Sequence, residues 1–262
     1  MTKPVFAAAQ CSVRAGDLAE NIQRHLVFMH AARRHGVRFL VFPELSLTGY
    51  EPALADALAQ QEDTALLEPL RSLAQDAAMT TVVGLPLRSA AHDKPLVAAF
   101  ILHADGNMTV HVKQHLHTGE EMYFSPGDGG PMLEVSGIPT ALSICADFGQ
   151  PSHAEAAAAA GAQVYAASVL IGEGGYPTDS TILRGYAEQH RMAVLLANHG
   201  GPTGGWTSAG RSAFWDERGA LVAAASGAGD QLLLVSRGNM GWVGSTVSVE
   251  VGVPSEEAGL AP

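Results

Sequence analysis

Short apolar runs alternate with amphipathic stretches along the first part of the chain. Residues 5–10 form a nearly continuous apolar run, which is typical of a strand covered on both faces. Residues 17–35 carry apolar side chains at helical spacing and end before Gly36, and residues 37–42 form a second apolar run. This order predicts a strand, a helix and a second strand, and we expect the two strands to pair in parallel.

The alternation continues to residue 236 and predicts an α/β fold. Further helices are predicted at residues 66–78, 154–160 and 182–191, and further strands at residues 81–85, 96–102, 109–113, 141–144, 163–170, 194–197, 212–215 and 231–236. Turn sequences at residues 104–107 and 216–219 predict two hairpins, and Gly161 suits the left-handed position that ends a helix. No linker or repeat divides the chain, so we expect one domain over residues 1–262, with 252–262 as a loose or partner-packed tail.

The composition narrows the class of protein. The 262 residues are 47% hydrophobic and 16% charged, which is enough apolar material for a large core. The net charge of -11 and the lack of a basic run argue against nucleic acid or an anionic membrane as a partner. No segment approaches the roughly 20 apolar residues of a membrane span, so we expect a cytoplasmic protein. In that compartment Cys11 and Cys145 are expected to be free thiols.

Three reactive side chains stand at the carboxyl ends of predicted strands: Glu44, Lys113 and Cys145. Ligands bind at this edge of an α/β sheet, so we expect the three side chains to converge on one pocket. A carboxylate can accept the proton of a thiol, and an ammonium group can stabilise both a thiolate and an oxyanion.

Cys145 lies between a predicted strand and the predicted helix 154–160. A nucleophile at such a turn is exposed at the sheet edge, and the free amides of the helix are expected to lower the pKa of the thiol and to hold an oxyanion. The alternative is a small buried core residue, as most free cysteines are. This stretch alone favours the core residue, whereas its combination with Glu44 and Lys113 favours a nucleophile.

The motifs around these residues resemble those of the nitrilase superfamily of carbon-nitrogen hydrolases. The matching stretches are Val41-Phe42-Pro43-Glu44-Leu45 with Thr48-Gly49-Tyr50, Lys113-Gln114-His115-Leu116 with Glu120 and residues 123–128, and Ser143-Ile144-Cys145-Ala146-Asp147 with Pro151. Further matches are Arg184, Ala187-Glu188, Ala197-Asn198, Ser208 and residues 214–219. In this order and spacing the motifs cover nearly the whole chain, which makes the resemblance specific.

The resemblance implies a catalytic set. Cys145 is expected to attack a carbonyl or nitrile carbon, with Glu44 as the general base. Lys113 is expected to stabilise the tetrahedral intermediate together with the amide of Ala146. Glu120 matches the second glutamate of the family, which orients the lysine and the substrate.

Glu120 is preferred to its neighbour Glu121 for that role, because Glu120 stands four residues before Phe124, the usual offset in the family. Glu121 is the second choice.

Four further residues are predicted to line the pocket: Tyr50, His115, Tyr123 and Leu170. The two tyrosines lie in loops that carry family motifs, His115 follows the lysine, and Leu170 ends the strand predicted at 163–170.

Histidines at positions 111, 115 and 117 alternate with Lys113, which suggests a metal site on one face of a strand. The cation in the middle of that face argues against this site. We therefore expect loop or surface histidines, no metal ligand and no cofactor.

By the same resemblance, the fold is a four-layer α-β-β-α sandwich, and pairing of copies through a helical layer predicts a homodimer or a larger assembly. The implied activity is hydrolysis of a small, linear, non-peptide amide through a thioester, with release of ammonia and a carboxylic acid. An N-carbamoyl amidohydrolase and a nitrilase stay open within the family. A non-catalytic thiol sensor or binding protein is the alternative from another class, and the joint presence of Glu44, Lys113 and Cys145 favours the enzyme.

Overall fold

The structure, a computed structural model, describes residues 6–252 and contains two β-sheets. The first has seven strands in the order β13 (Gly241–Ser248), β12 (Gln231–Gly238), β1 (Phe6–Gln10), β2 (Phe39–Val41), β3 (Thr80–Leu87), β4 (Leu96–Leu102) and β5 (Met108–Val112). The second has six in the order β11 (Leu221–Ala224), β10 (Ala213–Trp215), β9 (Ala193–Asn198), β8 (Val164–Val169), β7 (Ile138–Ile144) and β6 (Leu133–Val135). Apart from Gly252, the tail predicted at 252–262 lies outside the described residues.

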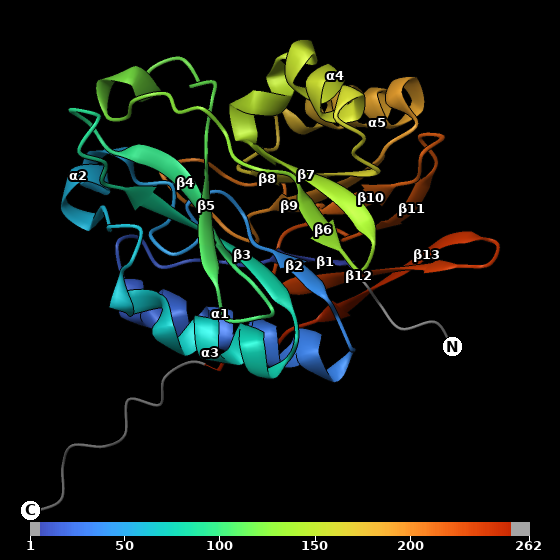
Figure 1. Ribbon diagram of the computed structural model, residues 1–262, viewed down its shortest axis with the longest axis horizontal. Coiled ribbons are helices and arrows are strands. Elements are labelled where there is room, and N and C mark those ends of the chain that lie inside the picture. Colours follow the sequence, from blue (N-terminus) through green and yellow to red (C-terminus); the bar gives the residue numbers. More distant parts are fainter. Residues whose placement is uncertain (1–5, 253–262) are drawn as a thin grey trace, which may run out of the picture.

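Helices cover the outer faces of both sheets (Figure 1). α1 (Leu18–Arg34) and α3 (Glu68–Asp76) pack beside each other on the seven-stranded sheet, and α4 (Pro151–Ala159) and α5 (Tyr176–His190) cover the six-stranded sheet. The shorter helical segments are α2 (Ala55–Leu58), η1 (Pro52–Leu54), η2 (Ala65–Leu67), η3 (Glu120–Met122) and η4 (Cys145–Gly149). Three hydrophobic clusters fill the spaces between the four layers, and the middle one joins the sheets through residues such as Phe39 and Phe214. The predicted four-layer α-β-β-α sandwich is confirmed.

The predicted pairings are also present. β1 and β2 pair in parallel, with Phe6 opposite Phe39. β4 and β5 form an antiparallel pair, as do β10 and β11, so both predicted hairpins are confirmed. Gly161 follows the end of α4 with φ +93°, the left-handed conformation expected there.

Four elements of the structure differ from the expected ones. β6 and β13 were not predicted, because β6 has only three residues and β13 mixes glycine with polar residues, and both are edge strands. α5 begins at Tyr176 rather than at residue 182, and its first turn contains Pro177, which is tolerated there, and polar residues. A short 3₁₀ segment, η4, separates Cys145 from α4, so the thiol does not lie at the start of the long helix.

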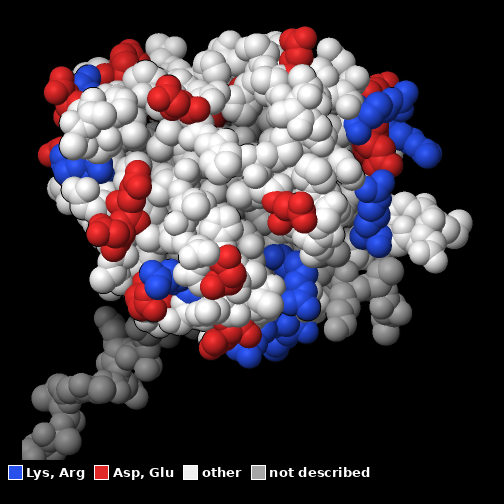
Figure 2. Space-filling model, viewed as in Figure 1, with Lys and Arg blue, Asp and Glu red and all other residues white. Residues whose placement is uncertain are grey.

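None of the helices within residues 6–252 is long and apolar enough to cross a membrane. On the face seen in Figure 2, carboxylates are spread widely, and Lys and Arg lie mostly near the edges of the view. The predicted homodimer stays a prediction.

Candidate active site

The structure brings Glu44, Lys113 and Cys145 together, but from strands of two sheets rather than from one sheet edge. Glu44 follows β2 and Lys113 follows β5, both in the seven-stranded sheet, whereas Cys145 follows β7 in the six-stranded sheet. The site therefore lies where the strand ends of the two packed sheets meet, which requires the sandwich to be assembled.

Lys113 is the centre of a buried charge cluster. Its Nζ lies 2.6 Å from Glu44 Oε1 and 2.8 Å from both Glu120 Oε1 and Oε2. Burial alone would lower the pKa of Lys113, but Glu44, Cys145 and Glu120 together raise it, so the side chain is an ammonium group. One buried cation thus contacts two buried carboxyl groups.

Glu120 is the glutamate that contacts the lysine. Its side chain is buried and also accepts hydrogen bonds from the Tyr50 hydroxyl at 2.8 Å and from the His117 amide at 2.7 Å. Glu121, by contrast, is exposed and accepts from the amide of Gly119. The geometry agrees with the choice of Glu120 over Glu121, because only Glu120 can position the ammonium group.

The turn that carries Glu44 is held tightly. Leu45 adopts φ +49°, and a Cβ atom at Gly84 in β3 would lie 2.3 Å from Leu45 N, so the turn packs directly on the neighbouring strand. His199 Nε2 donates a hydrogen bond of 2.7 Å to the carbonyl oxygen of Glu44.

Glu44 Oε2 is buried and has no hydrogen-bond partner among the described residues. This oxygen is therefore free to exchange a proton with a neighbouring group.

Burial raises the pKa of the Glu44 carboxyl group, and the Glu120 charge raises it further, against the opposing effect of Lys113. A general base with a raised pKa is a stronger proton acceptor.

Cys145 is the first residue of η4 and adopts φ +44°, a conformation that is rare for a residue with a side chain. Its Sγ lies 3.8 Å from the carbonyl oxygen of Leu170, which follows β8. The expected lowering of the thiol pKa is wrong for this structure: burial, and then the charge of Glu44, raise it well above the ordinary value, and Lys113 opposes them only in part. The thiol therefore needs a base to accept its proton, and Glu44 is the neighbouring base.

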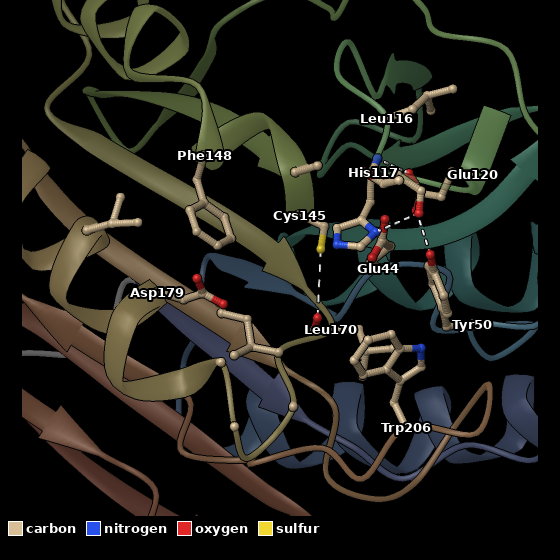
Figure 3. Close-up of a pocket in the computed structure, with 18 of the residues that line it drawn as sticks. Glu44, Tyr50, Leu116, His117, Glu120, Cys145, Phe148, Leu170, Asp179 and Trp206 are labelled. Atoms are coloured by element: carbon tan, nitrogen blue, oxygen red, sulfur yellow. Dashed lines mark hydrogen bonds between the residues drawn. The ribbon is translucent and has the colours of Figure 1, made fainter.

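A cavity of about 740 Å³ opens over this cluster. Figure 3 shows Glu44, Glu120 and Tyr50 on one side of Cys145, and Phe148 and Asp179 on the other. Of the residues predicted for the site, those that line the cavity are Glu44, Tyr50, Glu120, Cys145, Ala146 and Leu170.

Two predicted pocket residues lie elsewhere. Tyr123 directly follows η3 at the surface and is 40% exposed, and it is not among the residues that line the cavity. His115 lies beside a second cavity, because its backbone amide and Nδ1 are held by Asp147 Oδ1 at 2.8 and 3.1 Å. In the described structure, therefore, neither side chain lines the active-site cavity.

Several lining residues were missed or left open in the sequence. His117, expected at the surface, lines the cavity, as do Phe148, Glu173 and Asp179. Asp179 lies in the first turn of α5. A prediction that placed the start of this helix correctly would have pointed to Asp179 as a lining residue. His199 is far from the catalytic motifs in sequence, and only the packing of the two sheets places it behind Glu44.

Comparison with known proteins agrees with this geometry. The profile of the carbon-nitrogen hydrolase family matches residues 6–237. The chain belongs to the carbon-nitrogen hydrolase family. Among its relatives is the protein named "Hydrolase in pqqF 5'region" of Pseudomonas protegens, which is 32% identical over 204 residues that cover 74% of this chain and 69% of the relative. A glutamine-dependent NAD(+) synthetase of Mycobacterium tuberculosis is 30% identical over 73% of this chain, which spans only 30% of the synthetase.

Solved structures extend the comparison. The NitN amidase from Nesterenkonia sp. AN1 matches with a TM-score of 0.81 and 27% identity, covering 90% of this chain and 93% of that chain. A glutamate-to-glutamine variant of the Nesterenkonia amidase shows covalent addition of the acetamide moiety of fluoroacetamide at its active-site cysteine. This carbon-nitrogen hydrolase therefore has the nitrilase-superfamily fold and is an amidase-like enzyme.

Proposed function

We propose that this carbon-nitrogen hydrolase cleaves the primary amide of a small linear molecule through a thioester on Cys145. The observation that carries the proposal is that a thiol and a carboxyl group with a free buried oxygen line one cavity, with an ammonium group 2.6 Å from that carboxyl group. The Nesterenkonia amidase supports it, because one of its structures is a cysteine-to-alanine variant in complex with butyramide.

The geometry suggests the following steps. Glu44 accepts the thiol proton as Cys145 Sγ bonds to the amide carbon, and the electron pair of the carbonyl moves to oxygen. Lys113 and the amide of Ala146 stabilise that oxyanion. The tetrahedral intermediate then breaks its carbon-nitrogen bond, and the nitrogen leaves as ammonia with the proton that Glu44 returns.

The second half of the reaction restores the thiol. Glu44 accepts a proton from water as the water oxygen bonds to the thioester carbon. The carbon-sulfur bond breaks, the carboxylic acid leaves, and Cys145 regains its proton from Glu44. Glu120 takes no proton in this scheme but keeps the Lys113 ammonium group in place.

The charges on the cavity wall favour a neutral or positively charged acyl group. Besides the catalytic glutamates, the acidic residues Glu173 and Asp179 line the cavity. Within residues 6–252, no Lys or Arg lines it. Arg211 lies 3.4 Å from Glu173 and offsets part of its charge, whereas His117 opposes the effect of burial on the pKa of Asp179. A substrate carboxylate would meet like charge here, which disfavours N-carbamoyl amino acids.

The test is ammonia release from aliphatic amides, ω-amides with and without a terminal amine, N-carbamoyl amino acids and nitriles, with intact-mass detection of an acyl adduct. Ammonia from amides, together with an acyl mass that is absent in Cys145→Ala, is the expected result. Release of ammonia only from nitriles, or only from N-carbamoyl compounds, would identify the protein as a nitrilase or an N-carbamoyl amidohydrolase instead. No release from any compound, with a thiol alkylated no faster than free cysteine, would favour a non-catalytic thiol protein instead.

A further inference from the structure

A second group of ionisable side chains gathers outside the active-site cavity: His111 in β5, Asp147 in η4 and His153 in α4. Each offers a nitrogen or oxygen atom, and these atoms lie within 4.8 Å of one another. Asp147 is fully buried, His111 is 4% exposed, and the His153 side chain is 8% exposed. None of the three lines the active-site cavity.

His111 is the unusual member of the group. Neither of its ring nitrogens has a hydrogen-bond partner among the described residues, although the imidazole is almost completely buried. Buried polar groups in folded proteins are paired with other polar groups or bind metal ions. The expectation that His111 is a loop or surface residue is therefore wrong. Its buried ring nitrogens lack the polar partner or metal ion that such groups usually have.

His153 is held as metal-binding histidines usually are. Its Nδ1 lies 2.8 Å from the hydroxyl of the buried Tyr165, and its Nε2 lies 4.0 Å from Asp147 Oδ2. A hydrogen bond at one ring nitrogen fixes the orientation of the ring and leaves the other nitrogen for the ion. The gap to Asp147 is too long for a hydrogen bond and can be bridged by an ion that binds both atoms.

The Asp147 carboxylate is held by hydrogen bonds from three backbone amides. Its Oδ1 accepts hydrogen bonds from the amides of Gln114 and His115 at 3.0 and 2.8 Å, and its Oδ2 accepts one from the Ile144 amide at 3.1 Å. An ionised carboxylate has about four lone-pair positions, so Oδ2 keeps capacity for an ion.

We propose that His111, Asp147 and His153 bind a divalent transition-metal ion of the zinc type. Two imidazoles and one carboxylate are a ligand set that suits zinc and its neighbours, whereas magnesium and calcium prefer sites made of oxygen atoms. The unpartnered ring nitrogens of His111 and the free Nε2 of His153 can each supply one ligand atom. The proposal does not depend on the amidase reaction.

An ion can reach this group and complete its coordination. A second cavity of about 420 Å³ is lined by His111, His115 and His153. His115 is partly exposed and its Nδ1 contacts Asp147 Oδ1, so His115 or a water molecule can supply a fourth ligand. A bound ion would join β5, η4 and α4, the segments that lead to Lys113 and away from Cys145.

No spacing in the sequence indicates this group. The histidines that alternate around Lys113 suggested a site on one strand, but the structure separates them: His117 lines the active-site cavity and His111 faces Asp147 and His153. His153 lies far along the chain from His111, and the two meet where Asp147 in η4, just before α4, accepts hydrogen bonds from the amides of residues 114 and 115, just after β5.

The test is zinc binding to the full chain without a histidine tag, in a Cys145→Ala background. That background removes the active-site thiol as a competing ligand, so the result is independent of the proposed hydrolysis. The chain is stripped with a chelator and titrated with Zn²⁺ against a coloured competing chelator, and the same sample is titrated with Co²⁺, whose visible spectrum reports four-coordinate nitrogen and oxygen ligation. His111→Gln and His153→Gln are compared with His30→Gln, a control on the exposed face of α1.

We expect one ion per chain, a higher Tm in its presence and affinity at least roughly tenfold weaker in both His111→Gln and His153→Gln. His30→Gln should bind as the parent does. Absence of binding to the parent, or unchanged affinity in His153→Gln, would overturn the proposal. His153→Gln is decisive even where His111→Gln fails to fold, because glutamine can keep the hydrogen bond to Tyr165.

Discussion

His199 holds the backbone of Glu44 from the opposite sheet. Its Nε2 donates a hydrogen bond of 2.7 Å to the Glu44 carbonyl oxygen, and the imidazole is fully buried. His199 directly follows β9, which lies in the same sheet as the strand that leads to Cys145. The contact therefore fixes the proposed base relative to the proposed nucleophile.

His199→Phe is expected to lower kcat by about tenfold or more, because small displacements of a reacting group cost large factors in rate. It should also lower the free energy of unfolding by about 1–3 kcal/mol, because the Glu44 carbonyl loses its partner. Steady-state kinetics and urea unfolding measure the two effects. His199→Gln retains a donor and should recover part of kcat. A purely structural role would predict a loss of stability with kcat unchanged in His199→Phe.

Glu44→Gln is expected to reduce turnover of amides by about 10²- to 10⁴-fold, because the thiol then lacks the base that accepts its proton. Alkylation of Cys145 by a strong electrophile such as fluoroacetamide should persist, as the covalent adduct in the glutamate-to-glutamine variant of the Nesterenkonia amidase suggests. Rapid quenching with intact-mass detection measures acylation directly. An acyl-enzyme that still forms from an amide at the normal rate would contradict the base assignment.

The order of elements and the identity of the catalytic set could be predicted because both leave local signals. The parallel strands β2 and β7 contain apolar runs that are followed by Glu44 and Cys145, whereas Lys113 follows the antiparallel edge strand β5. Edge strand β13 leaves no such signal, because its glycine and polar residues pair with β12 without alternation.

The fine arrangement of the site could not be predicted, because it depends on contacts between residues distant in sequence. The pKa of Cys145 is raised by burial and then by the charge of Glu44, a residue about 100 positions away in sequence, and Lys113 opposes them only in part. The placement of His115 follows from Asp147, and that of His199 from sheet packing. None of these contacts has a fixed sequence spacing.

The pH dependence of kcat/KM should report the Glu44 carboxyl group. Its pKa is raised by burial, so activity is expected to fall as the pH drops through a value above the ordinary 4.5 for this carboxyl group. Glu120→Gln removes a like charge that raises this pKa and should move the acid limb to lower pH, with a lower kcat because Lys113 loses a partner. A limb that moves to higher pH in Glu120→Gln would contradict this account.

Gly84→Ala is expected to disturb the Glu44 turn. The added Cβ would lie 2.3 Å from Leu45 N and 2.8 Å from Leu45 Cα, and backbone atoms cannot rotate away as a side chain can. We expect a loss of about 1–3 kcal/mol in unfolding free energy together with reduced kcat. Gly185→Ala in α5 is the matched control, because nothing lies within 4 Å of its added Cβ and alanine favours a helix. Equal stability of the two variants would show that the turn can move without cost.

Asp179→Asn tests the charge of the acyl group that the cavity accepts. Burial raises the pKa of Asp179 and His117 opposes that effect, so the carboxylate is a partly desolvated charge on the cavity wall. For an amide with a terminal amine, the substitution should raise KM by roughly fivefold or less, the size of a solvent-screened ion pair. For a neutral amide of the same length, KM should be unchanged, and kcat should be similar for both. If KM rises equally for the neutral amide, Asp179 acts through the shape of the cavity, and the preference for a positively charged acyl group is wrong.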